Sequence, residues 1–123
     1  MKQIIANDAP KAIGPYSHGY ISGSLFFSSG QIPACPDGSP MPEGIEAQAH
    51  QACRNVEAVL KAAGTDFSKV VKTTCYLADM NDFAAFNKVY AEYFISRPAR
   101  SCVAVKTLPA GALCEIEVIA EIV

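Results

Sequence analysis

The end of the chain alternates so regularly between apolar and polar residues that it constrains the fold more than any other segment. Every second residue between Leu113 and Val123 is apolar, and glutamates stand at three of the intervening positions. A period of two is that of a β-strand, whose successive side chains point to opposite faces of a sheet. We therefore predict a strand with one face buried under helices. The apolar face consists of Cys114, Ile116, Val118, Ala120 and Ile122, and the other of Glu115, Glu117, Ile119 and Glu121.

Two amphipathic helices are predicted to cover that face. In residues 43–63 apolar residues recur at three- and four-residue steps, and Gly64 is a natural helix end. A second helix begins at about Asp82 and must stop near Arg97, because Pro98 disfavours helical geometry in the residue before it. Its stripe consists of Phe83, Phe86, Tyr90 and Phe94. On the first helix, the polar residues Glu46, Gln48, Gln51, Arg54, Asn55 and Lys61 are expected on the outer faces.

The remaining segments complete a sheet. Residues 18–22 and 25–29 flank Gly23-Ser24, a pair suited to a type II′ hairpin turn. The order hairpin, helix, strand, helix, strand, strand predicts one α+β domain spanning residues 1–123, with two helices on one face of a mixed sheet. The other expected elements are a loop over 33–44, a strand over 70–77 with Val71, Thr73, Cys75 and Leu77 on one side, a strand over 101–106 and a turn over 108–111.

Composition excludes several classes of function. Ten basic residues stand singly against twelve acidic ones, for a net charge of −2, whereas nucleic-acid binders usually carry a basic face. No apolar stretch approaches the roughly 20 residues that span a bilayer, and no secretory signal is visible, so a cytoplasmic protein is expected. The five cysteines and two histidines show no metal-binding spacing, which favours reduced thiols and no metal.

Arg100 and Glu115 are the pair with the clearest chemical potential. Arg100 follows a Pro-Ala step at the start of a strand, and a guanidinium can grip a carboxylate with two parallel hydrogen bonds. Glu115 is expected to project from the polar face of the neighbouring strand, where a carboxylate can hold or activate a water. Spacing alone favours solvated roles for both residues.

Other candidates have simpler structural explanations. Cys102 lies two residues after Arg100 and is a conceivable nucleophile, but both histidines are distant in sequence, so packing in the sheet is favoured. Gly30 is expected to serve a turn with positive φ, or else to expose its backbone N–H to a ligand. For His18 and His50 a structural or solvated role is the default.

Short motifs follow one another along nearly the whole chain: residues 12–17 (AIGPYS), 29–33 (SGQIP), Gln48-Ala49, Asn55-Val56, 72–74, Asp82-Phe83, Asn87, 98–103 (PARSCV), Leu108-Pro109 and 115–117. In this order they resemble the RidA family, formerly called YjgF. His18 departs from that pattern, since the family more often has glutamine there. The segment 95–98 is also shorter than in many relatives.

The resemblance implies a chorismate-mutase-like fold assembled as a homotrimer, with ligand sites in the clefts between subunits. It implies hydrolysis of 2-aminoacrylate, 2-iminopropanoate, 2-iminobutanoate and related species to 2-keto acids and ammonia, without a cofactor. Carried over by position, Arg100 binds the substrate carboxylate and Glu115 positions the attacking water. The backbones of Gly30 and Cys102 contact the substrate, and Tyr16, Ser29 and Asn87 line the pocket.

Two other functions remain open at this stage. The same cleft can belong to a non-catalytic module that binds a small carboxylate for regulation or protein protection. An RNA-directed activity has also been attributed to this family, although the acidic charge balance counts against it.

Overall fold

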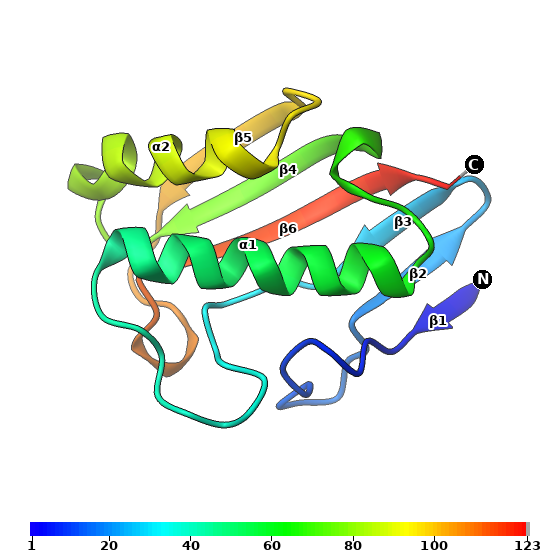
Figure 1. The fold of residues 1–123 in the computed structure, drawn as a ribbon, viewed down its shortest axis with the longest axis horizontal. Helices are drawn as coiled ribbons and strands as arrows, with labels where there is room; N and C mark the ends of the chain where they lie inside the picture. Colours follow the sequence, from blue (N-terminus) through cyan, green and yellow to red (C-terminus); the bar gives the residue numbers. More distant parts are fainter. Residues whose placement is uncertain (123) are drawn as a thin grey trace.

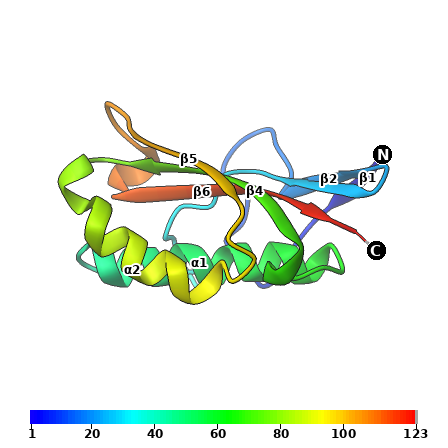
Figure 2. The ribbon, with the colours of Figure 1, turned by 90° about the horizontal axis from the view of Figure 1, so that it is seen from above.

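The computed structural model describes residues 1–122 and contains one mixed six-stranded sheet with two helices on the same face (Figures 1 and 2). The strand order is β1-β2-β3-β6-β4-β5; β4 and β5 run parallel, and all other neighbours are antiparallel. The predicted α+β arrangement is confirmed. The elements are β1 (Lys2–Ile4), β2 (Gly19–Ser22), β3 (Leu25–Ser28), α1 (Ile45–Ala62), β4 (Val70–Leu77), α2 (Phe83–Tyr93), β5 (Ala99–Ala104) and β6 (Cys114–Glu121), with 3₁₀ turns at Phe67–Lys69, Met80–Asp82 and Pro109–Gly111.

Strand β6 lies at the centre of the sheet, between β3 and β4, and one of its faces is buried as its alternation predicts. Its even-numbered residues are buried against the helices, and Ile116 is fully inaccessible. Burying a side chain of that size stabilises the fold by roughly 1.5–3 kcal/mol. The alternate residues lie on the second face, which neither helix covers (Figure 2). We call this uncovered side the open face; Val123 lies outside the described residues.

Helix α1 ends as the sequence predicts. Gly64 has a φ of 81°, which a glycine adopts without steric cost. The Gly64 N–H donates to the Lys61 carbonyl and the Thr65 N–H to the Leu60 carbonyl, both at 3.0 Å. This pair of bonds is a Schellman motif, which satisfies carbonyls left free by the last helical turn. Among residues 1–122, no helix is long and apolar enough to cross a membrane.

Helix α2 ends at Tyr93, earlier than the predicted stop near Arg97. Phe94 already leaves helical geometry, with φ of −89° and ψ of 66°, and its side chain is buried in the core. Arg97 then takes a φ of 51°, so the chain turns sharply towards β5. Pro98 disfavours a right-handed helical conformation at this residue, as expected, but the chain leaves the helix before reaching it.

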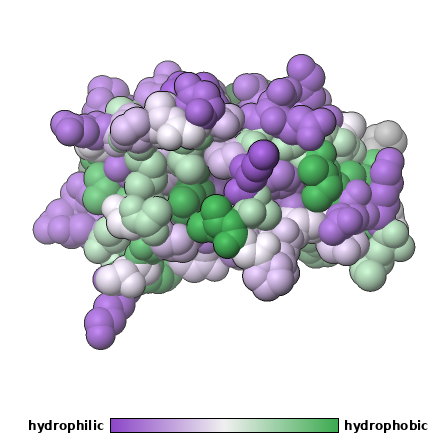
Figure 3. Space-filling model, turned by 90° about the horizontal axis from the view of Figure 1, so that it is seen from below, coloured by the Kyte–Doolittle hydropathy of each residue, from purple (hydrophilic) through white to green (hydrophobic). Residues whose placement is uncertain are grey.

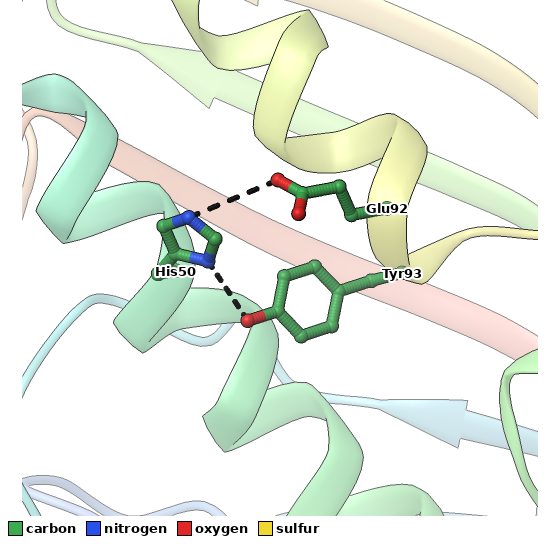
Figure 4. Close-up of polar contacts among 3 residues, drawn as sticks. All are labelled: His50, Glu92 and Tyr93. Atoms are coloured by element: carbon green, nitrogen blue, oxygen red, sulfur yellow. Dashed lines mark hydrogen bonds and ion pairs between the residues drawn. The ribbon is translucent and has the colours of Figure 1, made fainter.

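His50 joins the two helices, as Figure 4 shows. Its Nδ1 lies 2.9 Å from the Tyr93 hydroxyl, and its Nε2 lies 3.8 Å from a carboxylate oxygen of Glu92. The two rings also meet edge to face, with centroids 5.7 Å apart. The structural role expected for His50 is therefore confirmed.

Three strand predictions need correction. Val71 is 40% exposed, because a bulge between Val70 and Lys72 shifts the register and buries Val70 instead. Strand β5 occupies 99–104 rather than 101–106. Strand β1 was not predicted at all, because three residues are too short to show a period. The β2–β3 hairpin is confirmed, with a φ of 61° at Gly23.

Candidate functional site

A pocket of about 420 Å³ opens on the open face of the sheet. It gathers four of the seven predicted site residues, which come from the loop before β2, the segment after β3, and β6. The lining residues are Ile13, Tyr16, Ser28, Ser29, Gly30, Ile32, Pro109, Glu115 and Glu117.

Glycine is needed at position 30 because the Glu115 side chain lies close to its Cα, and not because of its backbone angles. Its φ is not in the positive region that was expected. A Cβ at this position would instead lie 2.8 Å from Cδ and 3.1 Å from Cγ of Glu115, well inside ordinary carbon–carbon contact. No protein group within residues 1–122 accepts the Gly30 N–H, so this donor is available to a ligand.

Glu115 is electrostatically primed to exchange a proton. Burial raises the pKa of its half-buried carboxyl, and the charge of Glu117 on the same face raises it further. Glu117 is itself held by the Tyr76 hydroxyl, which donates to Glu117 Oε1 at 2.8 Å and has a raised pKa as a consequence. A carboxylate whose pKa is raised is a stronger base than an exposed one, which suits it to accept a proton from a bound water.

Arg100 lies in a second depression, of about 720 Å³, between β5 and α2. Its Nη1 donates to Asn87 Oδ1 at 2.8 Å. The guanidinium carbon lies 4.7 Å from the centroid of the Tyr90 ring and 5.5 Å from that of Phe83. The cation is thus held by an amide and two aromatic rings, which fixes its orientation.

Cys102 follows Arg100 on the same face of β5. Burial raises the pKa of its thiol, and the nearby Arg100 opposes this only partly, so the thiolate required of a nucleophile is not favoured. The Val105 N–H donates to the Leu77 carbonyl across the parallel pair. In a parallel pair every second residue of one strand bonds to the other, and Val105 shows that the odd-numbered residues of this segment bond to β4. The backbone N–H and C=O of Cys102, an even-numbered residue, therefore face the free edge of the sheet.

The expected adjacency of Arg100 and Glu115 is wrong. Strand β4 lies between their strands, and the two side chains lie on opposite faces of the sheet. Arg100 pairs with Thr73, which is buried on the helix face, whereas Glu115 pairs with Tyr76 on the open face. The two strands are not neighbours because the chain crosses β4 after β5, so that β6 forms on the other side of β4.

Two buried amides were misassigned to the outer faces of α1. Asn55 is 1% exposed, and its Nδ2 donates to the carbonyls of Ile32 and Ala34 at 2.9 and 2.8 Å. Gln48 accepts the Leu113 N–H at 2.8 Å and donates to a loop carbonyl. These bonds fasten the loop that carries Ile32 of the pocket wall. Helical spacing cannot reveal such anchors, since their partners lie far away in sequence.

The remaining candidates have structural environments. His18 is buried under the loop before β2, and three of the five cysteines, Cys53, Cys75 and Cys114, are buried in the core. Burial raises the pKa of Cys75 and of Cys114 to about 12, which makes them inert as thiolates. Residues 1–122 hold no group of three or more side chains suited to a metal ion.

The six-stranded mixed sheet with two helices on one face defines a class of small α+β proteins. The family model described as Endoribonuclease L-PSP matches residues 6–122, and the chain belongs to this family, which is the RidA family of the sequence resemblance. The fold is accordingly the chorismate-mutase-like α+β fold.

Three relatives are close over their whole length. The 2-iminobutanoate/2-iminopropanoate deaminase of Salmonella typhimurium is 45% identical, covering 97% of this chain and 96% of that protein. The putative regulator AldR of Lactococcus lactis is 48% identical, covering 99% and 98%. The crystal structure of Escherichia coli TdcF with bound serine matches with a TM-score of 0.94 and 42% identity, covering 98% of each chain.

Proposed function

We propose that this protein is a 2-iminobutanoate/2-iminopropanoate deaminase whose active site is built from two copies of the chain. One copy supplies Arg100, Asn87 and the Cys102 backbone at the edge of β5. The other supplies the pocket with Glu115 and Gly30. The observation that carries this proposal is the position of Arg100 and Glu115 on opposite faces of one sheet. A single copy cannot bring them to one small substrate, whereas the free β5 edge of one copy can reach the pocket of another.

The open face supports such an assembly. Tyr20, Phe27 and Ile119 stand directly opposite one another on β2, β3 and β6, and form an apolar row across that face. Tyr20 and Phe27 are 39% and 41% exposed in the single chain. A ring of copies, each presenting its β5 edge to the next copy's open face, buries this row and is closed by a rotation axis. We propose a homotrimer with three interfacial sites.

The site chemistry suits hydrolysis of an imine. Arg100 binds the carboxylate of the 2-imino acid with paired hydrogen bonds, and the Gly30 N–H supports the other end. A water held by Glu115 attacks the C=N carbon, so that a C–O bond forms and the π electrons move to nitrogen. Glu115 takes the proton that water loses and returns it to nitrogen. Glu115 then takes the hydroxyl proton of this carbinolamine and passes it to nitrogen. The C=O bond forms as the C–N bond breaks with its electron pair on nitrogen, which leaves a 2-keto acid and ammonia.

The relatives support this substrate class. One of them is a 2-iminobutanoate/2-iminopropanoate deaminase by name, and another binds serine, a small 2-amino acid with the same carboxylate arrangement. No group of the proposed mechanism requires a cofactor. Imines of this kind are intermediates of amino-acid breakdown, so we place the protein in the cytoplasm.

The first test measures 2-keto acid formation while a serine or threonine dehydratase supplies the imine. The wild-type protein accelerates this step, and Arg100→Ala abolishes the acceleration without loss of the fold. A variant with unchanged activity contradicts the anchoring role of Arg100.

Mixing two inactive variants tests the shared site. Arg100→Ala and Glu115→Ala proteins, unfolded together and refolded, form random mixed rings. Half of the copies retain the arginine and half the glutamate, so about one quarter of the sites regain both. Recovery of about a quarter of wild-type activity supports the shared site; no recovery above the separate variants contradicts it.

A regulatory module is the second candidate, favoured by the 48% identical relative named as a putative regulator. It predicts that 2-keto acids raise the melting temperature while the protein accelerates hydrolysis of no imine. The charge balance gives no support to RNA as the ligand.

A further inference from the structure

The buried side chain of His18 holds the loop between β1 and β2 in place through two hydrogen bonds. It is 5% exposed, and both of its ring nitrogens bond to that loop. The Ala6 N–H donates to Nδ1 at 2.8 Å, and Nε2 lies 2.7 Å from the Pro10 carbonyl oxygen. Because a carbonyl only accepts, Nε2 must carry the proton, and Nδ1 must be bare. One neutral tautomer therefore satisfies both bonds.

The same residue also supports the opposite wall of the pocket. The His18 carbonyl accepts the Ser29 N–H at 2.9 Å, and the Ser29 hydroxyl donates to the Ser17 carbonyl at 2.6 Å. Ser29 adjoins Gly30, against which Glu115 lies.

The tied loop carries Ile13 and Tyr16 of the pocket lining, which are 76% and 47% exposed. Figure 3 views the molecule from the side on which this loop lies, and hydrophobic residues there interrupt the hydrophilic surface. Ala6 and Ala9 at the start of the loop are buried in the core, so packing anchors its first part but not these two exposed side chains. The position of the part that carries them also depends on backbone bonds and on the two bonds to His18.

We propose that His18 is a positioning residue for the imine site: its two bonds to the β1–β2 loop keep the Tyr16 wall in place beside Glu115. A side chain that forms neither bond lets that wall move away from Glu115. This role rests on the proposed function, because it concerns the same pocket.

Two substitutions separate positioning from general stability. Glutamine can accept the Ala6 N–H with its carbonyl oxygen and donate to the Pro10 oxygen with its amide. His18→Gln should therefore keep the wild-type kcat/KM. His18→Leu cannot form either bond, and its kcat/KM should fall about tenfold or more, because a misplaced wall costs orientation.

Hydrogen exchange gives a readout that does not depend on catalysis. Protection factors of amides 6–16 should be the same in His18→Gln as in the wild type, and lower in His18→Leu. If His18→Leu loses melting temperature but keeps kcat/KM, or if His18→Gln is as impaired as His18→Leu, the positioning role is overturned. A wild type that hydrolyses no imine refutes the proposed function alone, while the exchange data still decide whether His18 holds the loop.

Discussion

Gly30→Ala is the substitution that most directly tests the geometry of the pocket. The new methyl carbon would lie 2.8 Å from Glu115 Cδ, whereas carbon atoms in contact are about 3.5–4.0 Å apart, so one of the two must move by about 1 Å. The glycine side is pinned, because Gln31 and Ile116 exchange two backbone bonds of 2.8 and 3.0 Å. The carboxylate therefore moves. Overpacking of this kind costs about 1–3 kcal/mol, and a displacement of 1 Å at a reacting group costs about 100-fold in rate.

Chemical denaturation and the coupled 2-keto acid assay measure the two effects separately. Gly23→Ala is the matched control. It adds the same methyl group to another glycine, whose φ is 61°, but no atom lies within 4 Å of the added carbon. It should lose about 1–2 kcal/mol of stability through backbone strain and keep its kcat/KM.

The Glu115→Ala background supplies the decisive comparison. With the carboxylate removed, Gly30→Ala should cost at least about 1 kcal/mol less than it does in the wild type, which is a coupling free energy between the two positions. An equal cost in both backgrounds, or wild-type kcat/KM in Gly30→Ala, would refute the packing argument.

Three further predictions follow from the site. Glu117→Gln removes the charge that helps raise the pKa of Glu115; since the deprotonated form is the active base, the acid limb of the kcat/KM profile should shift to lower pH. Arg100→Lys keeps the charge but loses the paired hydrogen bonds, so kcat/KM should fall by roughly 10- to 100-fold, about 1.5–3 kcal/mol. The loss should fall mostly on KM, because Arg100 holds the carboxylate equally in the bound substrate and in the transition state. Asn55→Ala breaks two buried bonds to the 32–34 loop and should lower the unfolding free energy by about 2–3 kcal/mol in denaturant titrations.

Local patterns in the sequence were sufficient for most of the secondary structure. The limits of β4 and the Gly64 cap of α1 agree with the structure, because each depends on residues only a few positions apart. The same reasoning misplaced Val71, since a bulge is created by the partner strand and leaves no local signature. It also placed Asn55 in solvent, because the carbonyls it binds come from a distant loop.

The candidate site residues likewise came from the sequence, through motifs that match a family along nearly the whole chain. Only the tertiary structure decided which of them lie together. The insertion of β6 between β3 and β4 is a pairing of segments far apart in the chain, and the registers of β4 with β5 and β6 set Arg100 and Glu115 on opposite faces. The same pairing lays Glu115 across Gly30, so the need for glycine there arises from a contact and not from a backbone angle. Periodicity determines which face of an element is apolar. Only the pairing of the strands in the folded chain determines which residues each face contacts.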